Sequence, residues 1–445
     1  MSPTFQALSN RNYRLYAGGA VVSNVGTWMQ RVAQDWLVLQ LTNNSGTALG
    51  ITTGLQFLPM LLLSPYAGVI ADRFPKRRLL QLTQLMMAGP ALLLGVLAVT
   101  GVVQIWHVYA LALIFGVGTA FDAPARQAFV GEIVDHEDLP NAVGLNSASF
   151  NAARMIGPAV AGLMIAALGS GVEATGLVIM INAFSYGAVI LVLQRLRAGE
   201  LNSPDLVPRS KGAIRDGLSY VRGRPDLMLV LTIVFFAGMF GLNFQMTSAL
   251  MTTEVYGKGA SAYGILGTIM AVGSLTGSLM AARRGQPRHR LVIGAAIAFG
   301  LVEITAGLMP TYLTFALVLP LLGFMALTMI TAANTTMQLT VAPELRGRVM
   351  ALYLMIFMGG TPIGSPIVGW VGETFGARWT LIGGGAMTIL GTLLAVLIFS
   401  RSQGLITRQR RQEMRSRAGA AIQRTPLRTW RAASQTSKPP AAVCR

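Results

Sequence analysis

The chain is a succession of long apolar stretches separated by short polar segments. Each stretch holds about 20 mostly apolar residues, the length that a helix needs to cross a bilayer core of roughly 30 Å. The expected spans are 16–41, 47–71, 79–100, 106–127, 141–168, 172–195, 226–250, 261–283, 290–309, 312–336, 348–371 and 378–400. This pattern predicts an all-α polytopic membrane protein with twelve transmembrane helices.

The composition supports this fold class. Of the 445 residues, 53% are hydrophobic and 12% are charged, whereas an ordinary soluble domain carries about 25% charged residues. The mean hydropathy is +0.56, and the 50 glycines suit helices that approach one another closely. The first ten residues lack the features of a cleavable signal peptide, so we expect the first span to remain as an anchor.

The basic residues are concentrated on the segments expected on one side of the membrane. A net charge of +18 would also suit a nucleic-acid-binding protein. With a cytoplasmic N-terminus, however, all but four of the 35 Lys and Arg residues fall on cytoplasmic segments. The exceptions are Lys258 and Arg378 on the other side, and Arg31 and Arg154 within spans. This asymmetry predicts a protein of the cytoplasmic (inner) membrane with both termini inside, in contact with lipid and not with nucleic acid.

The sequence lacks the motifs of several kinds of catalytic and metal-binding site. Cys444 is the only cysteine, so the chain can form neither an internal disulfide nor a Cys-ligated metal site. The sequence contains no phosphate-binding loop, zinc-protease motif, nucleophile elbow or haem motif. The histidines His107, His136 and His289 lie at span ends or in loops. We therefore expect no enzyme, no cofactor and no metal.

A charged turn follows the second span. Between Gly68 and Leu80, four basic residues and the carboxylate of Asp72 occur within seven residues. The run resembles the signature loop Gly-x-x-x-Asp-Arg-x-Gly-Arg-Arg/Lys between the second and third helices of the major facilitator superfamily, with Pro75 where that family usually has Gly. The resemblance implies a secondary transporter that works by alternating access and is built from two pseudo-symmetric six-helix bundles.

The resemblance also implies a conformational latch. In the family, the Asp of this loop meets the N-terminal end of the eleventh helix, which here opens at Arg348. A carboxylate at a helix N-terminus gains about 0.3–1 kcal/mol, enough to bias two balanced states. The expected latch residues are Gly68, Asp72, Arg73, Asp122 and Arg126, the last two being four residues apart at the end of span four. The alternative is a basic loop that only directs topology.

Other runs resemble exporters of the superfamily. Gln30 to Leu39 reads Gln-x-x-Ala-x-x-Trp-Leu-Val-Leu and, with Phe121 to Gln127, resembles the bacterial branch around the enterobactin exporter. In span five, Gly157, Pro158 and Gly162 are similar to the family's antiporter motif, although a packing face alone is the alternative. The resemblance implies export in exchange for protons. The span-four arginine that some members use in proton transfer is missing, because residues 111–116 are apolar.

Span one carries four side chains with polar or charged groups on one face. Asn24, Trp28, Arg31 and Asp35 are spaced by four, three and four residues, which places them on the same side of a helix. This face must avoid lipid, because a charge at membrane depth costs at least about 2.5–3.5 kcal/mol. Either Arg31 and Asp35 form a structural ion pair, or they belong to a proton or substrate site. Arg154 in span five could face Asp35 or an anionic group of a substrate.

Further polar residues are expected at the centre of the bundle. By the resemblance, spans one, four, seven and ten line the central cavity. The remaining candidates for the proton or substrate pathway are Gln56, Asn243, Gln245, Thr331 and Asn334. Glu303 lies in span nine, which is peripheral in this fold, so its expected state is protonated or paired.

The chain divides into two halves and a tail. Residues 1–195 and 226–400 form the expected six-helix bundles, joined by a cytoplasmic linker at 196–225. A shift of 207 residues aligns eight identical residues, among them Gly157 with Gly364 and Gly162 with Gly369, which indicates duplication. Residues 401–445 are basic and are expected to form a disordered cytoplasmic tail near anionic headgroups.

These observations predict a monomeric, proton-coupled exporter of a small hydrophobic or amphipathic compound, such as a drug, a siderophore or a secondary metabolite. Three alternatives remain. The same fold would serve an importer of a small nutrient or a lysophospholipid flippase, and a membrane receptor would bind ligand without moving it. Concentrative uptake of a nutrient, pH-independent movement of lipid, or binding without transport would distinguish these alternatives.

Overall fold

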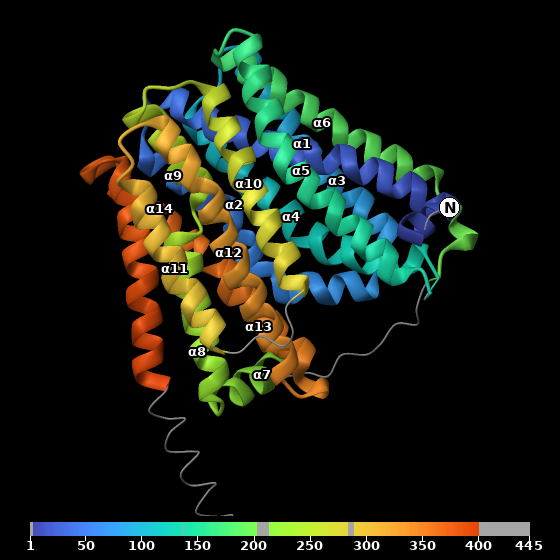
Figure 1. Ribbon diagram of the computed structural model, residues 1–445. Helices are drawn as coiled ribbons and strands as arrows, with labels where there is room; N and C mark the ends of the chain where they lie inside the picture. Colours follow the sequence, from blue (N-terminus) through green and yellow to red (C-terminus); the bar gives the residue numbers. More distant parts are fainter. Residues whose placement is uncertain (1–2, 136, 203–212, 284–288, 400–445) are drawn as a thin grey trace, which may run out of the picture.

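The computed structural model describes residues 3–135, 137–202, 213–283 and 289–399 (Figure 1). All regular structure in this part is helical, and eleven helical segments are long and apolar enough to cross a bilayer. The first helix, α1 (Arg11–Leu41), is not one of the eleven, yet it packs along α5 (Leu139–Ala167) and α6 (Val172–Arg195) inside the bundle. The predicted all-α polytopic class is confirmed, with eleven apolar spans and α1 beside them. The basic tail lies outside the described residues.

Each half is a bundle of helices. The first half consists of η1 (Pro3–Ser9), α1, α2 (Gly46–Arg73), α3 (Lys76–Val99), α4 (Ile105–Ile133), α5 and α6. The second half consists of α8 (Pro225–Phe236), η3 (Ala237–Gly241), α9 (Phe244–Leu250), η4 (Met251–Val255), α10 (Ala260–Arg283), α11 (His289–Gly307), α12 (Tyr312–Thr340), α13 (Pro343–Gly359), α14 (Thr361–Phe375) and a last helix, Ala377–Phe399. Between the halves lie η2 (Ala198–Glu200) and α7 (Ala213–Arg222), and α7 packs against α13.

Local sequence explains where several helices begin. The side chains of Asn10, Ser45 and Thr311 accept hydrogen bonds from the first turns of α1, α2 and α12, which satisfies backbone donors that would otherwise lack partners. Gly376, at φ +99°, turns the chain between α14 and the last helix. These short connections keep consecutive spans antiparallel.

Two spans are less regular than their apolar runs predict. The seventh extends over Pro225–Val255 and contains the π-helical turns η3 and η4. The eleventh is divided at Gly360 into α13 and α14. At this division the seventh and eleventh spans approach closely, since a Cβ on Gly360 would lie 2.8 Å from the backbone nitrogen of Met239. Packing between spans therefore shapes both helices.

The two halves contact each other mainly at one end. We call the end at which Phe74 and Pro75 connect α2 with α3 the motif end, and the opposite end the far end. At the far end α2 packs on α14, where a Cβ on Gly46 would lie 2.5 Å from the carbonyl oxygen of Gly369. Likewise, α5 packs on α10, and Thr268 donates a hydrogen bond of 2.6 Å to the carbonyl of Met155. These two helix pairs close the far end.

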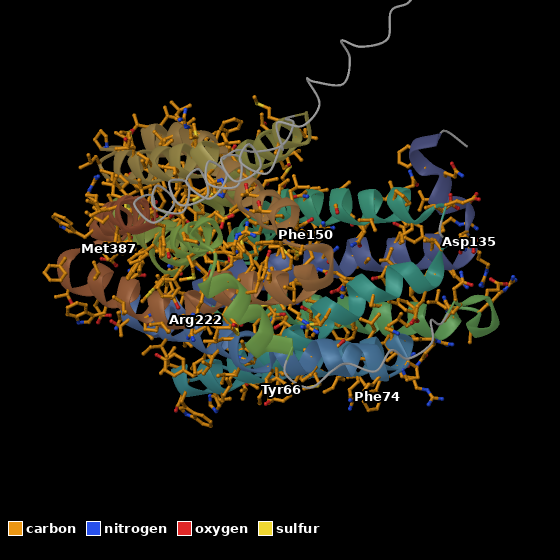
Figure 2. The ribbon with its side chains drawn as sticks, turned by 90° about the horizontal axis from the view of Figure 1, so that it is seen from below. Tyr66, Phe74, Asp135, Phe150, Arg222 and Met387 are labelled. Atoms are coloured by element: carbon orange, nitrogen blue, oxygen red, sulfur yellow. The ribbon has the colours of Figure 1, made fainter. Side chains whose placement is uncertain are left out.

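Toward the motif end the halves diverge. In Figure 1 the first half runs to the right, toward the N-terminus, whereas α7, α8 and α13 lie at the bottom of the picture. The view from below in Figure 2 places Phe150 of α5 near the centre, and Tyr66 of α2 and Phe74, which follows α2, at the edge of the molecule. All three side chains are exposed. The structure is therefore closed at the far end and splayed at the motif end.

Candidate substrate and proton pathway

Asp35 joins the two halves of the protein. It lies near the far end of α1, and 8% of its surface is exposed. The hydroxyl of Tyr263 in α10 donates a hydrogen bond of 2.8 Å to Oδ2 of Asp35. The ring of Tyr263 also stacks on Trp36, with 6.5 Å between the ring centroids. Because α1 and α10 belong to different halves, this hydrogen bond links the two halves near the far end.

Arg31 does not form the ion pair that its spacing from Asp35 suggests. These two described side chains share neither an ion pair nor a hydrogen bond, and Nε of Arg31 is buried without a hydrogen-bond partner. The Arg31 guanidinium lies instead 4.9 Å from the ring centroid of Trp28 and 5.5 Å from that of Phe57 in α2. Stacking on aromatic rings thus replaces the ion pair.

Arg154 of α5 lies against the same indole ring. Its guanidinium carbon is 5.7 Å from the ring centroid of Trp28. Gly157, about one turn further along α5, lets α1 come close, because a Cβ there would lie 2.6 Å from Cβ of Trp28. Two arginines from different helices therefore share one aromatic ring.

The charges of these two arginines are only partly compensated. A charged side chain at membrane depth costs at least about 2.5–3.5 kcal/mol. A cation–π contact contributes about 0.5–1 kcal/mol at exposed sites and about 2 kcal/mol when desolvated. Asp35 is the one acidic residue of α1, and α5 and α10 contain none. The region around Trp28 therefore has an excess of positive charge.

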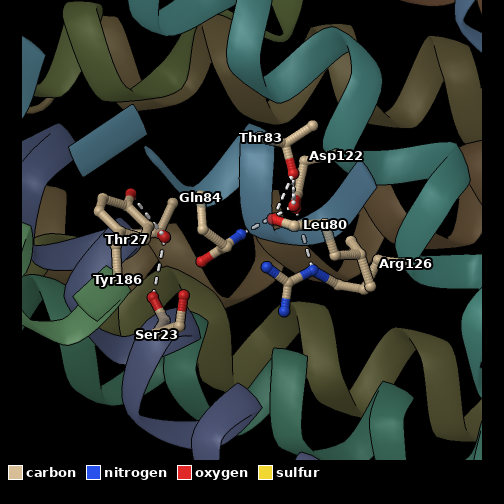
Figure 3. A network of polar contacts seen from close by, with 8 residues as sticks. All are labelled: Ser23, Thr27, Leu80, Thr83, Gln84, Asp122, Arg126 and Tyr186. Carbon is tan, nitrogen blue, oxygen red and sulfur yellow. Dashed lines mark hydrogen bonds and ion pairs between the residues drawn. The ribbon is translucent and has the colours of Figure 1, made fainter. Parts of the chain in front are cut away.

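Asp122 and Arg126 form the i,i+4 pair that their spacing indicates. Nε of Arg126 lies 3.0 Å from Oδ2 of Asp122. Figure 3 shows that Oδ1 of Asp122 also accepts hydrogen bonds from Thr83, at 2.9 Å, and Gln84, at 2.8 Å. Since Thr83 and Gln84 belong to α3, this network ties α4 to α3 within the first half. Among the described residues, none of its hydrogen bonds reaches the second half.

The signature loop is anchored by contacts that sequence reasoning did not identify. Nζ of Lys76 lies 2.8 Å from Oε1 of Glu132 at the end of α4, and both side chains are at least nine-tenths buried. The guanidinium of Arg77 donates to the last carbonyls of α6, at 2.6 and 2.8 Å. Arg73 is exposed. The one sign of these contacts in the sequence was Glu132, an acid close to the end of span four with no evident partner nearby in the chain.

For Gly68 and Asp72 of the proposed latch, the structure describes the helix that they belong to but not their side-chain contacts. Gly68 and Asp72 belong to the last turns of α2, but the side chain of Asp72 lies outside the described part of the structure. The contact between Asp72 and the start of the eleventh span stays a prediction.

A carboxylate at the far end was also missed. Oε2 of Glu373, at the end of α14, accepts a hydrogen bond of 2.7 Å from Oγ of Ser45 and one of 2.8 Å from the backbone N–H of Thr47. Glu373 thereby caps the N-terminus of α2 from the opposite half, where a negative charge is stabilised. In sequence, Ser45 is an ordinary helix cap, and nothing local links it to Glu373.

The antiporter-type motif lies where α5 meets its two neighbours. Gly157 of α5 packs against α1, as described above. Gly162 packs against α10, where its Cβ would lie 2.4 Å from the carbonyl oxygen of Ala260. The carbonyl of Pro158 in turn faces Gly264, whose Cβ would lie 2.2 Å from it. The motif therefore allows close packing both within the first half and between the halves.

The other polar candidates do not gather around Asp35. Oε1 of Gln56 accepts a long hydrogen bond of 3.4 Å from Gln34 of α1. Asn243 is buried beside η3 and donates to the carbonyl of Met239 at 2.8 Å. The remaining candidates are Asn24, which is buried, and Gln245, Thr331 and Asn334, which are partly exposed. Among the described contacts, none of these side chains bonds to Asp35 or Arg31.

Glu303 occupies a separate position in the second half. It is 1% exposed, and its Oε2 has no hydrogen-bond partner. The nearest surroundings include Gly241 and Gly384, where an added Cβ would lie 3.0 Å from its carboxylate oxygens. No described ion pair involves Glu303, so of the two states expected for it, protonated or paired, the paired one is not formed here.

Comparisons with known proteins agree with this architecture. The family model "Transmembrane secretion effector" (MFS_3) matches residues 2–420. The staphyloferrin A transporter of Staphylococcus aureus is 25% identical over 387 residues, covering 84% of this chain and 93% of the relative. The multidrug efflux pump Tap of Mycolicibacterium fortuitum is 26% identical over 389 residues, covering 85% and 92%.

The fold is shared with solved transporters. A bacterial homologue of the human lysosomal transporter Spinster, solved in an inward-facing and unoccupied conformation, superimposes with a TM-score of 0.68 at 14% sequence identity. The match covers 87% of this chain and 97% of that structure.

Proposed function

Since the chain belongs to the transmembrane secretion effector family of major facilitator transporters, we propose that this secondary transporter exports a small hydrophobic or amphipathic compound in exchange for protons. One relative named above is a multidrug efflux pump, which supports the export direction. The observation that carries the proposal is the hydrogen bond between Asp35 and Tyr263, because it couples an ionisable group to the contact between the halves.

Asp35 is the residue that we assign to proton exchange. In the first half, the buried acids Asp122 and Glu132 are held by Arg126 and Lys76 at the motif end. Among the residues that the structure describes, Asp35 has no cation within ion-pair distance, and it bonds to the opposite half instead. An intramembrane ionisable residue of this kind is a functional candidate by default.

The hydrogen bond between Tyr263 and Asp35 would change the proton affinity of Asp35 in the direction that proton-driven export requires. An ionised Asp35 accepts a charge-assisted hydrogen bond from Tyr263, which stabilises the closed far end. Protonation removes that charge and weakens the bond. The state that is open at the far end therefore holds the proton more tightly, and the state that is open at the motif end releases it. A proton entering from the far side would thus leave at the motif end.

We assign the motif end and both termini to the cytoplasm. This orientation follows from the distribution of Lys and Arg, and it makes the present conformation open toward the cytoplasm. In the same scheme, Asp72 would stabilise the opposite state by meeting the start of α13 at the motif end. A balanced pair of states needs only small differences in free energy to shift its populations.

Transport in inside-out proteoliposomes with an acidic interior tests the proposal. Wild-type protein should accumulate fluorescent amphipathic dyes when the pH gradient is imposed. Asp35→Asn should abolish this accumulation while retaining dye binding, because the amide cannot exchange a proton. Glu173→Gln is the matched control, since Glu173 is an exposed acid at the start of α6. It should transport normally.

Four outcomes would contradict the proposal. Normal gradient-driven accumulation by Asp35→Asn would remove Asp35 from proton coupling. Movement of lysophospholipid that does not respond to pH would favour a flippase, and concentrative uptake of a nutrient in the opposite direction would favour an importer. Dye binding without any transport would indicate a receptor.

A further inference from the structure

We infer that Arg31, Arg154 and Trp28 form a binding site for the anionic group of the transported compound, so that the substrate class is an amphipathic organic anion. This inference rests on the proposed export function, because it assigns a substrate class to the same pathway. The site lies between α1 and α5, beside Phe57 of α2.

The first argument is charge. The two guanidinium groups share the indole ring of Trp28, at 4.9 and 5.7 Å from its centroid. Nε of Arg31 is buried without a partner, and the one acid of α1, Asp35, bonds to Tyr263. A single carboxylate therefore faces two cations. An anion bound between the arginines would neutralise the excess charge and accept a hydrogen bond from Nε of Arg31, which has no acceptor in the described part of the chain.

The second argument is access. Arg31, Arg154 and Trp28 are each partly exposed. Phe150 forms an edge-to-face contact with Trp28, with 5.8 Å between the ring centroids, and 46% of its surface is exposed. Figure 2 places Phe150 centrally in the molecule. The partial exposure of these side chains leaves the arginines open to a ligand on the side of Phe150.

The third argument is the chemistry of the neighbouring side chains. Arginine presents a planar fork of donors that suits carboxylate, sulfonate or phosphate groups. Trp28, Phe57 and Phe150 offer aromatic surfaces around this fork. Such a site favours a ligand that joins an anionic head to an aromatic or aliphatic body. A cation would be repelled by both arginines.

A matched set of probes tests the inference. The compounds are 2-naphthoate, its uncharged analogue 2-naphthamide, and the cation 2-naphthylmethylammonium. Binding is measured by equilibrium dialysis on the purified full-length protein in phosphatidylcholine nanodiscs, without a pH gradient. Wild-type protein should bind 2-naphthoate most tightly and the cation least. Arg154→Gln should weaken 2-naphthoate binding about 10- to 100-fold, the scale for losing a hydrogen bond to a charged group, and leave 2-naphthamide unchanged.

Two further variants keep the test decisive. Arg154→Lys retains the charge but not the planar fork, so it should weaken 2-naphthoate binding less than Arg154→Gln. Lys258→Gln removes one charge from an exposed position before α10 and should change nothing. Retained 2-naphthamide binding shows that a variant is folded. If a variant does not fold, the corresponding change at Arg31 replaces it.

Several results would overturn the inference. These are equal binding of the three probes, no 2-naphthoate binding at all, or 2-naphthoate binding that ignores Arg154→Gln. Complete displacement of 2-naphthoate by phosphatidylglycerol in the nanodisc, also dependent on Arg154, would identify a lipid headgroup site instead. Because binding is measured without transport, these results are independent of Asp35 coupling: gradient-driven export of cations alone would refute the inference and leave the proposed export standing.

Discussion

Replacing Tyr263 with phenylalanine removes one hydroxyl from the contact between the two halves. In the structure this hydroxyl donates a hydrogen bond of 2.8 Å to Oδ2 of Asp35, and the ring stacks on Trp36. Phenylalanine keeps the ring, so the change is confined to the hydrogen bond. A hydrogen bond to a charged group contributes about 1.5–3 kcal/mol. If the bond exists only while the far end is closed, Tyr263→Phe should raise the open-to-closed ratio about 10- to 100-fold.

Cysteine labelling measures this shift. Ser365 of α14 is fully buried at the far end, beside Gly50 of α2. A Ser365→Cys reporter, in a background in which Cys444 is replaced by serine, should react slowly with a membrane-impermeant maleimide added outside whole cells. Adding Tyr263→Phe should increase the labelling rate by roughly the same 10- to 100-fold, as long as the open state remains a minor population.

A matched variant separates the effect from general loosening. The hydroxyl of Tyr256 donates to the carbonyl of Met309 at 3.0 Å, within the second half. Tyr256→Phe should therefore leave the labelling of the Ser365→Cys reporter unchanged. An unchanged rate in Tyr263→Phe would refute the role of this bond in closing the far end. Labelling that occurs only from the cytoplasmic side would refute the assigned orientation.

Two further predictions concern the other carboxylates at the helix ends. Glu373→Gln keeps the shape of the cap on α2 but removes its charge, so it should raise labelling of the same reporter about two- to fivefold, and Glu173→Gln should not. Lys76→Ala leaves Glu132 buried without its partner and should lower the free energy of unfolding by about 3–5 kcal/mol, measured by chemical denaturation of the purified protein. The apolar double variant Lys76→Met with Glu132→Leu should recover most of that loss, and a double variant as unstable as Lys76→Ala would show that the ion pair is not the cause.

The sequence determined the parts of this protein that depend on local patterns. Apolar runs of span length predict transmembrane helices because lipid offers no partner for backbone polar groups. The spacing of Asn24, Trp28, Arg31 and Asp35 predicts one helical face in the same way. The i,i+4 spacing of Asp122 and Arg126 predicts their pair, since helical neighbours are set by the chain itself.

The tertiary structure decided which of these groups meet. Asp35 and Tyr263 are 228 residues apart, and their hydrogen bond exists only because α1 and α10 pack at the far end. Arg31 could pair with Asp35 by spacing, yet it lies on the ring of Trp28, and the packing of α5 on α1 brings Arg154 to the same ring. Glu373 caps α2 for the same reason, through close contact between Gly46 and Gly369. Contacts between helices depend on how two bundles approach each other, and a local pattern of residues does not contain that information.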